Sequence, residues 1–314
     1  MAKDKGLESL ELTDTAESGT EVRAGGKLLF RYVHQPATDP LESPRPFIHP
    51  LKTLAGWEVT DFRPEDHPWH HGLSMTSANL SGENFWGGAT FVPGEQYAHL
   101  ENYVQLDNNG VQRHEGWDKR ECSGGKAELT HRLAWITRAG ERWLEERRRI
   151  SVAELDEAAG FWSLDISISL RNVSGRELAF GSPTTKGRPD AGYGGLIWRG
   201  SPSFNGGTVL ASAGKGGAGM MGQRSPWLAY SGAGWNPAKP EATLVFLDHP
   251  ANPRHPTKWF VRNTSTPLVS FAFMFDEELK VKSGDSLDLR YRVVIANGGW
   301  TRERVESYAG GLKW

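Results

Sequence analysis

The 314-residue sequence has a single cysteine, Cys122, and almost no net charge, since 36 basic and 38 acidic side chains leave a formal charge of −2. One cysteine excludes an intramolecular disulfide and a CxxC metal knuckle. The two signs of charge are mixed along the chain, which excludes the concentrated basic patch that binds nucleic acid or an anionic membrane. We therefore expect neither a nucleic-acid partner nor a membrane partner.

Long apolar runs are also missing. The most apolar stretch, PLVSFAFMF at 267–275, is far shorter than the roughly 20 residues of a transmembrane helix. The N-terminal MAKDKGLESLELTD carries charges where a signal peptide needs an apolar segment. These absences predict a cytoplasmic protein. The glycine-rich stretch at 211–223 lacks the GxxxxGK(S/T) order of a phosphate-binding loop, so no nucleotide cofactor is expected.

Helical periodicity is scarce, whereas strand-like alternation is common. In FWSLDISISLR at 161–171 the apolar residues fall on one face and the polar residues on the other. The segments 126–136 and 286–296 alternate in the same way. Only 301–312 has the pattern of a helix, ending at a glycine pair. Further strands are predicted at 27–34, 72–80, 142–152, 193–199, 242–248 and 267–275.

Strands that follow one another without intervening helices indicate mainly antiparallel sheets. Because β-sandwiches commonly exceed about 200 residues as one domain, we expect residues 1–314 to form a single large sandwich, with its core at about 20–300. Its exposed sheet edges would also permit a homodimer.

The sequence DFRPEDHPWHHG at 61–72 places His67, His70 and His71 within five positions. Imidazole exchanges protons near neutral pH, so these histidines and His249 are predicted to be catalytic. If the segment is a helical turn, the first three share one face. If it enters a strand, His70 and His71 point to opposite faces and only one reaches a pocket; the extended-looking GLSMTSANL that follows favours this second arrangement.

Imidazole is also a metal ligand. His49 and His249 each precede a proline, which favours an extended backbone and holds the ring on a stiff segment. His49, His67, His71 and His249 are therefore the candidate ligands for a divalent metal, and the sequence leaves the presence of that metal open.

Aromatic and polar residues near the histidines suggest a carbohydrate site, because sugar rings stack on aromatic faces while their hydroxyls need polar partners. GYGGLIWRG at 192–200 brings Tyr193 and Arg199, and the guanidinium would pair with a substrate carboxylate or with a buried acid such as Asp66. The predicted substrate-binding residues are His49, Asp66, Trp69, Tyr193, Arg199 and Trp259.

The stretch from FIHPL to SGENFW at 47–86, together with GYGGLIWRG, LDHPANPRHPTKWFV and SGDSLDLRYRVVIANGGW, resembles the bacterial family labelled "methane oxygenase PmoA". The resemblance spans about residues 28–300. It implies a supersandwich similar to galactose mutarotase and an association with sugar catabolism. Methane oxidation is not expected, because a methane monooxygenase subunit is a membrane protein and this chain has no apolar span. The mutarotase catalytic glutamate and histidine have no counterpart that can be aligned here.

These observations predict a carbohydrate-active enzyme that uses histidines as acid and base on a small-molecule sugar or keto-sugar, by epimerisation, elimination or hydrolysis. Two alternatives stay open. One is a non-catalytic sugar-binding or sensing protein. The other is a metal-dependent lyase or oxygenase with histidine ligands.

Overall fold

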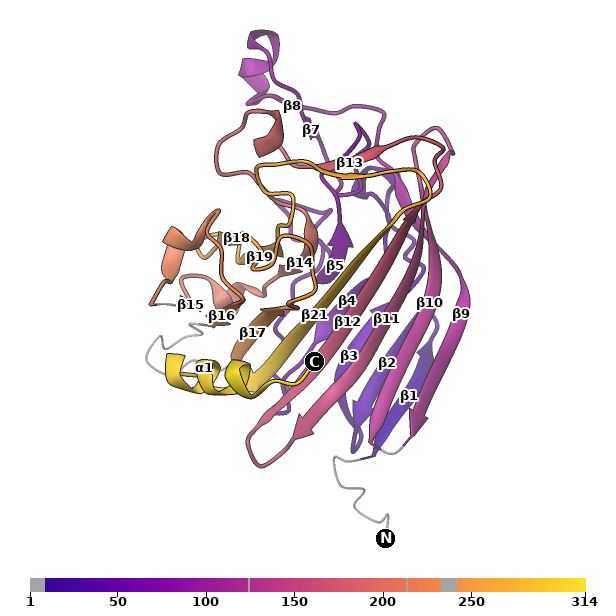
Figure 1. Cartoon of the computed structure of the whole chain (residues 1–314). Coiled ribbons are helices and arrows are strands. Elements are labelled where there is room, and N and C mark those ends of the chain that lie inside the picture. The colour runs from indigo at the N-terminus through magenta and orange to yellow at the C-terminus, as the bar shows by residue number, and fades with distance from the viewer. Residues whose placement is uncertain (1–8, 124, 213, 233–241) are drawn as a thin grey trace.

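The computed structural model describes residues 9–123, 125–212, 214–232 and 242–314. Two eight-stranded sheets face one another, and the long strands of the second lie side by side in Figure 1. The first sheet has the order β1 (Leu10–Thr15), β2 (Gly19–Ala24), β3 (Lys27–Val33), β4 (Phe47–Leu51), β5 (Leu73–Thr76), β14 (Gly195–Arg199), β19 (Leu268–Phe271) and β18 (Trp259–Arg262). The second has the order β15 (Thr208–Ala211), β16 (Trp227–Ser231), β17 (Ala242–Asp248), β21 (Ser286–Asn297), β12 (Phe161–Asn172), β11 (Arg142–Asp156), β10 (Lys126–Ile136) and β9 (Val111–Ser123).

The neighbouring strands in both sheets pair antiparallel, for example β12 with β21 and β14 with β19. Two small sheets lie at the periphery of the sandwich. One orders β20 (Leu279–Val281), β13 (Leu178–Gly181) and β6 (Asn79–Leu80), and the other pairs β7 (Thr90–Phe91) with β8 (Tyr103–Val104). The predicted all-β antiparallel sandwich with one short C-terminal helix is confirmed; its finer likeness to galactose mutarotase stays a prediction.

Alternation along the strands decides which side chains fill the core. In β12 the apolar set that begins at Trp162 and ends at Leu170 is buried between the two sheets. In β18, Trp259 and Val261 point into this core, so Phe260 and Arg262 face outward. The outer face of the first sheet therefore has its own apolar surface, on which a cavity is built.

Strands with strong alternation were found where the sequence predicts them, and β10 begins and ends as expected. β9 escaped prediction because most of its side chains are at least partly exposed and two register shifts interrupt its pairing with β10. The segment 72–80 forms two strands, β5 and β6, instead of one.

The helix α1 (Arg302–Gly311) lies against the outer face of the second sheet (Figure 1). The Thr301 hydroxyl accepts a hydrogen bond from the backbone N–H of Arg304 and caps the first turn. Val305 is buried in a small cluster with Trp227 and Trp300, which anchors the helix. Within the described part of the chain, no helix has the length and apolar character needed to cross a membrane.

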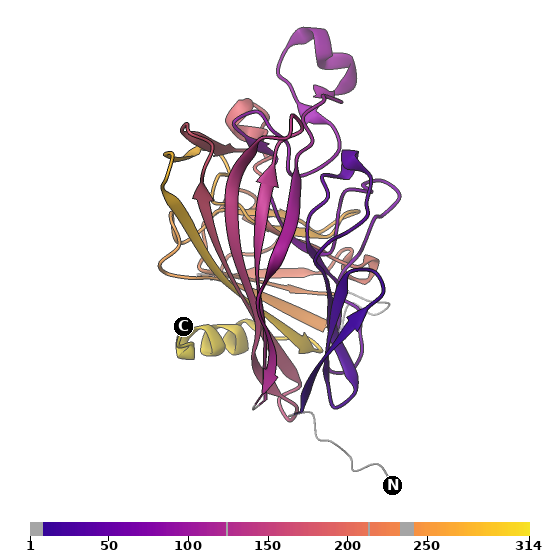
Figure 2. The same ribbon diagram turned by 90° about the vertical axis from the view of Figure 1, so that its right-hand side faces the viewer.

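A segment containing β7, the short helix η2 (Glu95–Leu100) and β8 rises from the top of the molecule in both views (Figures 1 and 2). Its returning strand carries Tyr103 towards the outer face of the first sheet, where the hydroxyl lies 2.8 Å from that of Tyr193. The segment thus contributes to a site whose other residues come from much earlier and later in the chain.

Candidate functional site

A cavity of about 310 Å³ lies over β14, β18 and β19, on the outer face of the first sheet. Its walls come from five separate stretches of chain, so the fold and not a local motif assembles it. The residues that line it include His67, Trp69, His70, Trp86, Glu101, Tyr103, Arg188, Tyr193, Phe260 and Arg262.

A row of rings forms one wall of the cavity. The ring centroids lie 5.3 Å apart for His70 and Trp86, 4.5 Å for Trp86 and Tyr193, and 5.5 Å for Tyr193 and Phe260. Trp69 adds a further ring beside His67. Such a surface suits the apolar C–H face of a sugar ring.

His67 and His70 stack at one end of this row, with ring centroids 4.6 Å apart. The segment that carries them is a turn: the N–H of His67 donates to the carbonyl of Pro64, and the N–H of His70 donates to the carbonyl of His67. His71 then forms a bridge with Phe62 and leads into β5. As expected if the segment enters a strand, only one of the two histidines reaches the cavity: His70 lines it and His71 does not.

Asp66 sets the proton position on His67. Its carboxylate lies 2.7 Å from Nδ1 of His67. Partial burial acts to raise the pKa of Asp66, but the hydrogen bond from His67 and the charge of Arg199 outweigh it and lower the pKa below its ordinary value. The carboxylate is therefore ionised and accepts the Nδ1 proton, so the neutral tautomer of His67 that fits this contact has its free lone pair on Nε2.

Arg199 places the proton of His70 on the other ring nitrogen, Nε2. Burial, with a further contribution from the positive charge of Arg199, holds the pKa of His70 well below its usual range, so this ring is neutral near pH 7. Nη1 of Arg199 lies 3.5 Å from Nδ1 of His70, and a guanidinium only donates. Nδ1 is thus the acceptor and Nε2 carries the proton, with no protein partner among the described residues.

Arg199 itself lies between two carboxylates, 3.7 Å from Asp61 and 3.8 Å from Asp66. The ion pair with Asp66 is the one expected from the sequence, although Asp66 is exposed and not buried. Because Asp61 and Asp66 balance its charge, Arg199 influences the cavity through its contact with His70.

Buried Arg45 holds two aromatic side chains of the wall in place. Its guanidinium donates to the backbone carbonyls of Trp69 at 2.7 Å and Trp86 at 3.0 Å. Gly87 and Gly88 follow Trp86 with positive φ, and a Cβ on either would lie less than 3 Å from Trp69. The glycine pair therefore allows Trp69 to pack directly on backbone.

His71 is sealed beneath the cavity. Its Nε2 donates to the buried carboxylate of Glu42 at 2.9 Å, and Arg63 pairs with the same carboxylate at 2.8 Å. Burial, partly offset by Glu42, lowers the pKa of His71 to about 4. Its Nδ1 is buried and has no hydrogen-bond partner among the residues that the structure describes, as suits the lone pair of a neutral ring.

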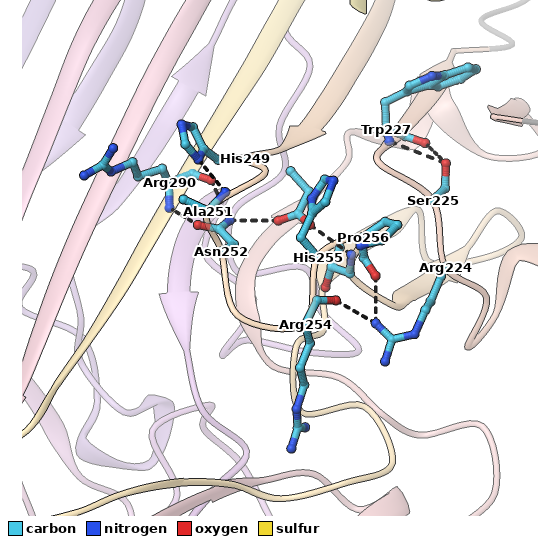
Figure 3. A network of polar contacts seen from close by, with 12 residues as sticks. Arg224, Ser225, Trp227, His249, Ala251, Asn252, Arg254, His255, Pro256 and Arg290 are labelled. Atoms are coloured by element: carbon cyan, nitrogen blue, oxygen red, sulfur yellow. Dashed lines mark hydrogen bonds and ion pairs between the residues drawn. The ribbon is translucent and has the colours of Figure 1, made fainter.

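Three further predicted site residues lie away from the cavity. His49 contacts the hydroxyl of Thr60 at 3.0 Å. Trp259 is fully buried in the core, on the opposite face of β18 from Phe260. His249 lies on the outer face of the second sheet, beside Arg290 and Ala251 (Figure 3), where its Nδ1 accepts a hydrogen bond from the N–H of Ala251.

The proposed metal ligands are not brought together. His49 and His71 each contact the ring of Phe62, whereas His249 contacts the indole of Trp314. Across the described ranges, no group of three or more histidine, cysteine or acidic side chains is arranged to hold a metal ion.

The structure therefore brings together His67, Trp69, His70 and Tyr193 around the cavity, with Asp66 and Arg199 directly behind the histidines. Several wall residues carried no signal of spacing in the sequence, because they reach the cavity from distant loops and strand ends. They are Glu101, Tyr103, Arg188, Phe260 and Arg262, together with Arg45 behind the wall.

Comparison with protein-family models identifies the family to which the chain belongs. Residues 19–310 match the model described as "Family of unknown function (DUF6807)". The chain belongs to this family. No curated protein matches it. The family description assigns no activity, so the resemblance to the family labelled "methane oxygenase PmoA" stays a prediction.

Solved structures give remote likenesses. A mutant of the heparan sulfate lyase HepC from Pedobacter heparinus is 10% identical with a TM-score of 0.39, over 95% of this chain and 36% of that chain. A glycoside hydrolase family 97 enzyme from Pseudoalteromonas sp. strain K8, in complex with panose, is 7% identical with a TM-score of 0.35, over 92% and 34%. The Slr1438 protein from Synechocystis sp. PCC 6803 is 11% identical with a TM-score of 0.36, over 95% and 99%. This chain spans about a third of the length of the first two, and scores this low do not bear on function.

Proposed function

We propose that this protein is a carbohydrate-active enzyme that moves protons on a sugar or keto-sugar bound in the aromatic cavity. The observation that carries the proposal is the stacked pair of His67 and His70. Asp66 leaves the first ring with a free lone pair, whereas Arg199 leaves the second with a free N–H. The cavity therefore holds a proton acceptor and a proton donor side by side.

The chemistry follows from these two roles. With a keto-sugar, Nε2 of His67 takes the proton from the carbon next to the carbonyl. Nε2–H of His70 meanwhile donates to the carbonyl oxygen, where negative charge develops. Delivery of a proton from water to the opposite face, with loss of the proton on His67 to solvent, gives an epimer, whereas loss of a neighbouring oxygen substituent gives an elimination product. The wall formed by Trp86 and Tyr193 would hold the ring against the two imidazoles.

Isotope exchange tests the proposal whichever of these reactions the enzyme catalyses, because each begins with removal of a carbon-bound proton. The protein is incubated in D₂O with a panel of aldoses, uronates and 3-keto-glycosides, and ¹H NMR follows loss of carbon-bound protons, new epimers or released sugar. We expect turnover of at least one panel member. His67→Gln and His70→Gln should each lower that rate by about 10²–10⁴-fold.

The matched control is His49→Gln, which changes a histidine of the same sheet outside the cavity. It should retain the rate. Binding of a sugar without any exchange or conversion would instead favour the non-catalytic sugar-binding alternative. Equal activity in wild type, H67Q and H70Q would overturn the assignment of the two imidazoles.

A further inference from the structure

We propose that the cavity selects sugars that carry a carboxylate, such as uronates, and that Arg188 and Arg262 bind that carboxylate. This inference rests on the proposed function, because it names the class of sugar that the same cavity takes.

Arg262 is the first part of the argument. It is the last residue of β18 and faces outward into the cavity. Its guanidinium lies over the ring of Phe260, 5.5 Å from the centroid. Among the described residues, no carboxylate pairs with it, although most arginines of this protein have such a partner. A cation left without a counter-ion in an aromatic cavity is suited to an anionic ligand.

Arg188 is the second cation. It approaches from the loop before β14, donates to the hydroxyl of Tyr103 and lies 4.7 Å from the centroid of that ring. It too has no carboxylate partner in the described part of the chain. The charges of Arg188 and Arg262 both act on Tyr193, against the burial that raises the pKa of its phenol well above its usual range. Each guanidinium contacts a ring that itself contacts Tyr193: Arg188 contacts Tyr103, and Arg262 lies over Phe260.

The charge balance favours a monoanion. Glu101 is the one carboxylate among the described residues that line the cavity, so the two free arginines leave a surplus of one positive charge. Beside the histidines, Arg199 is already flanked by Asp61 and Asp66. The surplus is therefore confined to the end formed by Arg188 and Arg262. A carboxylate neutralises it, whereas a phosphate monoester would leave an unpaired negative charge.

The row of rings connects this cationic end to the catalytic histidines. It runs from His70 through Trp86 and Tyr193 to Phe260, next to Arg262. A sugar ring lying on Trp86 and Tyr193 would place its carboxylate at the arginines and its opposite carbons at the imidazoles. The carboxylate would then fix which carbon meets the acid and the base.

Isothermal titration calorimetry with D-glucuronate and D-galacturonate, against D-glucose and D-galactose, tests the inference. We expect the uronates to bind about tenfold to a hundredfold more tightly, as for a charge-assisted hydrogen bond pair. Arg188→Gln and Arg262→Gln should each remove most of that preference and leave the affinity for neutral sugars unchanged. Arg290→Gln is the matched control, since it removes a positive charge from the outer face of the other sheet.

The remaining outcomes separate the two proposals. Equal affinity for uronates and neutral sugars would overturn the carboxylate inference and leave the proposed function standing. Tighter binding of glucose 6-phosphate than of glucuronate would overturn it in favour of a phosphate site. Loss of the preference in R290Q to the same extent as in R262Q would reduce it to a general charge effect and overturn it. Absence of binding by every sugar would overturn the proposed function as well.

Discussion

Two pairs of neighbouring imidazoles lie on opposite sides of the first sheet, and their surroundings differ. In the interior, His131 contacts His114 at 2.9 Å through Nδ1 and the hydroxyl of Tyr32 at 2.7 Å through Nε2. In the cavity, His67 and His70 each contact a polar group of the described residues through Nδ1 and not through Nε2. The interior ring has both nitrogens bonded within the fold, whereas the cavity rings keep one nitrogen for a ligand.

The same contrast holds for the arginines. Arg148, in the interior, pairs with buried Glu146 at 2.6 Å and also donates to Gln112 and Tyr32. Arg262, in the cavity, has an aromatic ring beneath it and no acid beside it among the described residues. A fully paired buried network specifies how the two sheets pack. A buried network with an unpaired group costs stability, and proteins retain such a network where a bound ligand supplies the missing partner.

The interior network should give the largest effect on stability. Arg148→Met leaves the carboxylate of Glu146 buried with, among the described residues, the indole N–H of Trp135 as its one side-chain donor, so we expect a loss of about 3–5 kcal/mol in the free energy of unfolding. Urea denaturation measures it. Arg149→Met, which breaks the exposed pair with Glu128, is the control and should cost less than about 1 kcal/mol. Similar losses in both variants would mean that burial does not distinguish the two pairs.

Acid should weaken the fold through the buried histidines. The pKa of His71 and of His49 is lowered to about 4, in both cases by burial first. The unfolded chain takes up these protons near pH 6.5, whereas the folded chain stays neutral until about pH 4. The free energy of unfolding should therefore fall as pH decreases through this window, by roughly 3 kcal/mol for the fully buried His71 and by less for the partly exposed His49. His49→Gln should flatten the profile measured by denaturation at successive pH values; an unchanged slope would contradict the assignment.

Substitution of Asp66 should give a smaller effect, on turnover through the cavity histidines. Asp66→Asn removes the carboxylate that fixes the proton on Nδ1 of His67. We expect kcat to fall by about 10–100-fold with little change in KM, because Asp66 positions the base and does not line the cavity. Asp61→Asn, which also lies beside Arg199 but not His67, is the matched variant. A change in KM alone would indicate a binding role instead.

His249 should give the smallest effect. It lies on the outer face of the second sheet, so His249→Gln should change turnover by less than about twofold and the free energy of unfolding by no more than about 0.5 kcal/mol. Loss of turnover in this variant would show that the outer groove of the second sheet, and not the cavity, holds the chemistry.

Local patterns were sufficient to predict the strands with strong alternation and part of the site. Alternation along 161–171 reflects burial of one face, so β12 was predicted nearly to its ends. The histidine-rich segment was recognisable because three imidazoles within five positions are rare. The same reasoning could not separate His70 from His71, since the partners that distinguish them, Arg199 and Glu42, are remote in sequence.

The rest of the site depends on long-range contacts that no local pattern records. Trp259 and Phe260 are adjacent aromatic residues, and only the direction in which β18 enters the sheet decides that Phe260 faces the cavity. No local pattern marks Arg45 as buried, because apart from the hydroxyl of Ser74 its hydrogen-bond partners are backbone carbonyls, which every residue possesses.

The guanidinium of Arg45 has a consequence for how substitutions in the cavity wall combine. Because Arg45 holds the carbonyls of Trp69 and Trp86 at once, a shift of either loop is transmitted to the other through a single side chain. Substitutions in the two loops should therefore be epistatic: their effects on ligand affinity should depart from additivity when Arg45 is present and become independent in an Arg45→Lys background. Diversification of the pocket would then proceed by coordinated replacement of both loops.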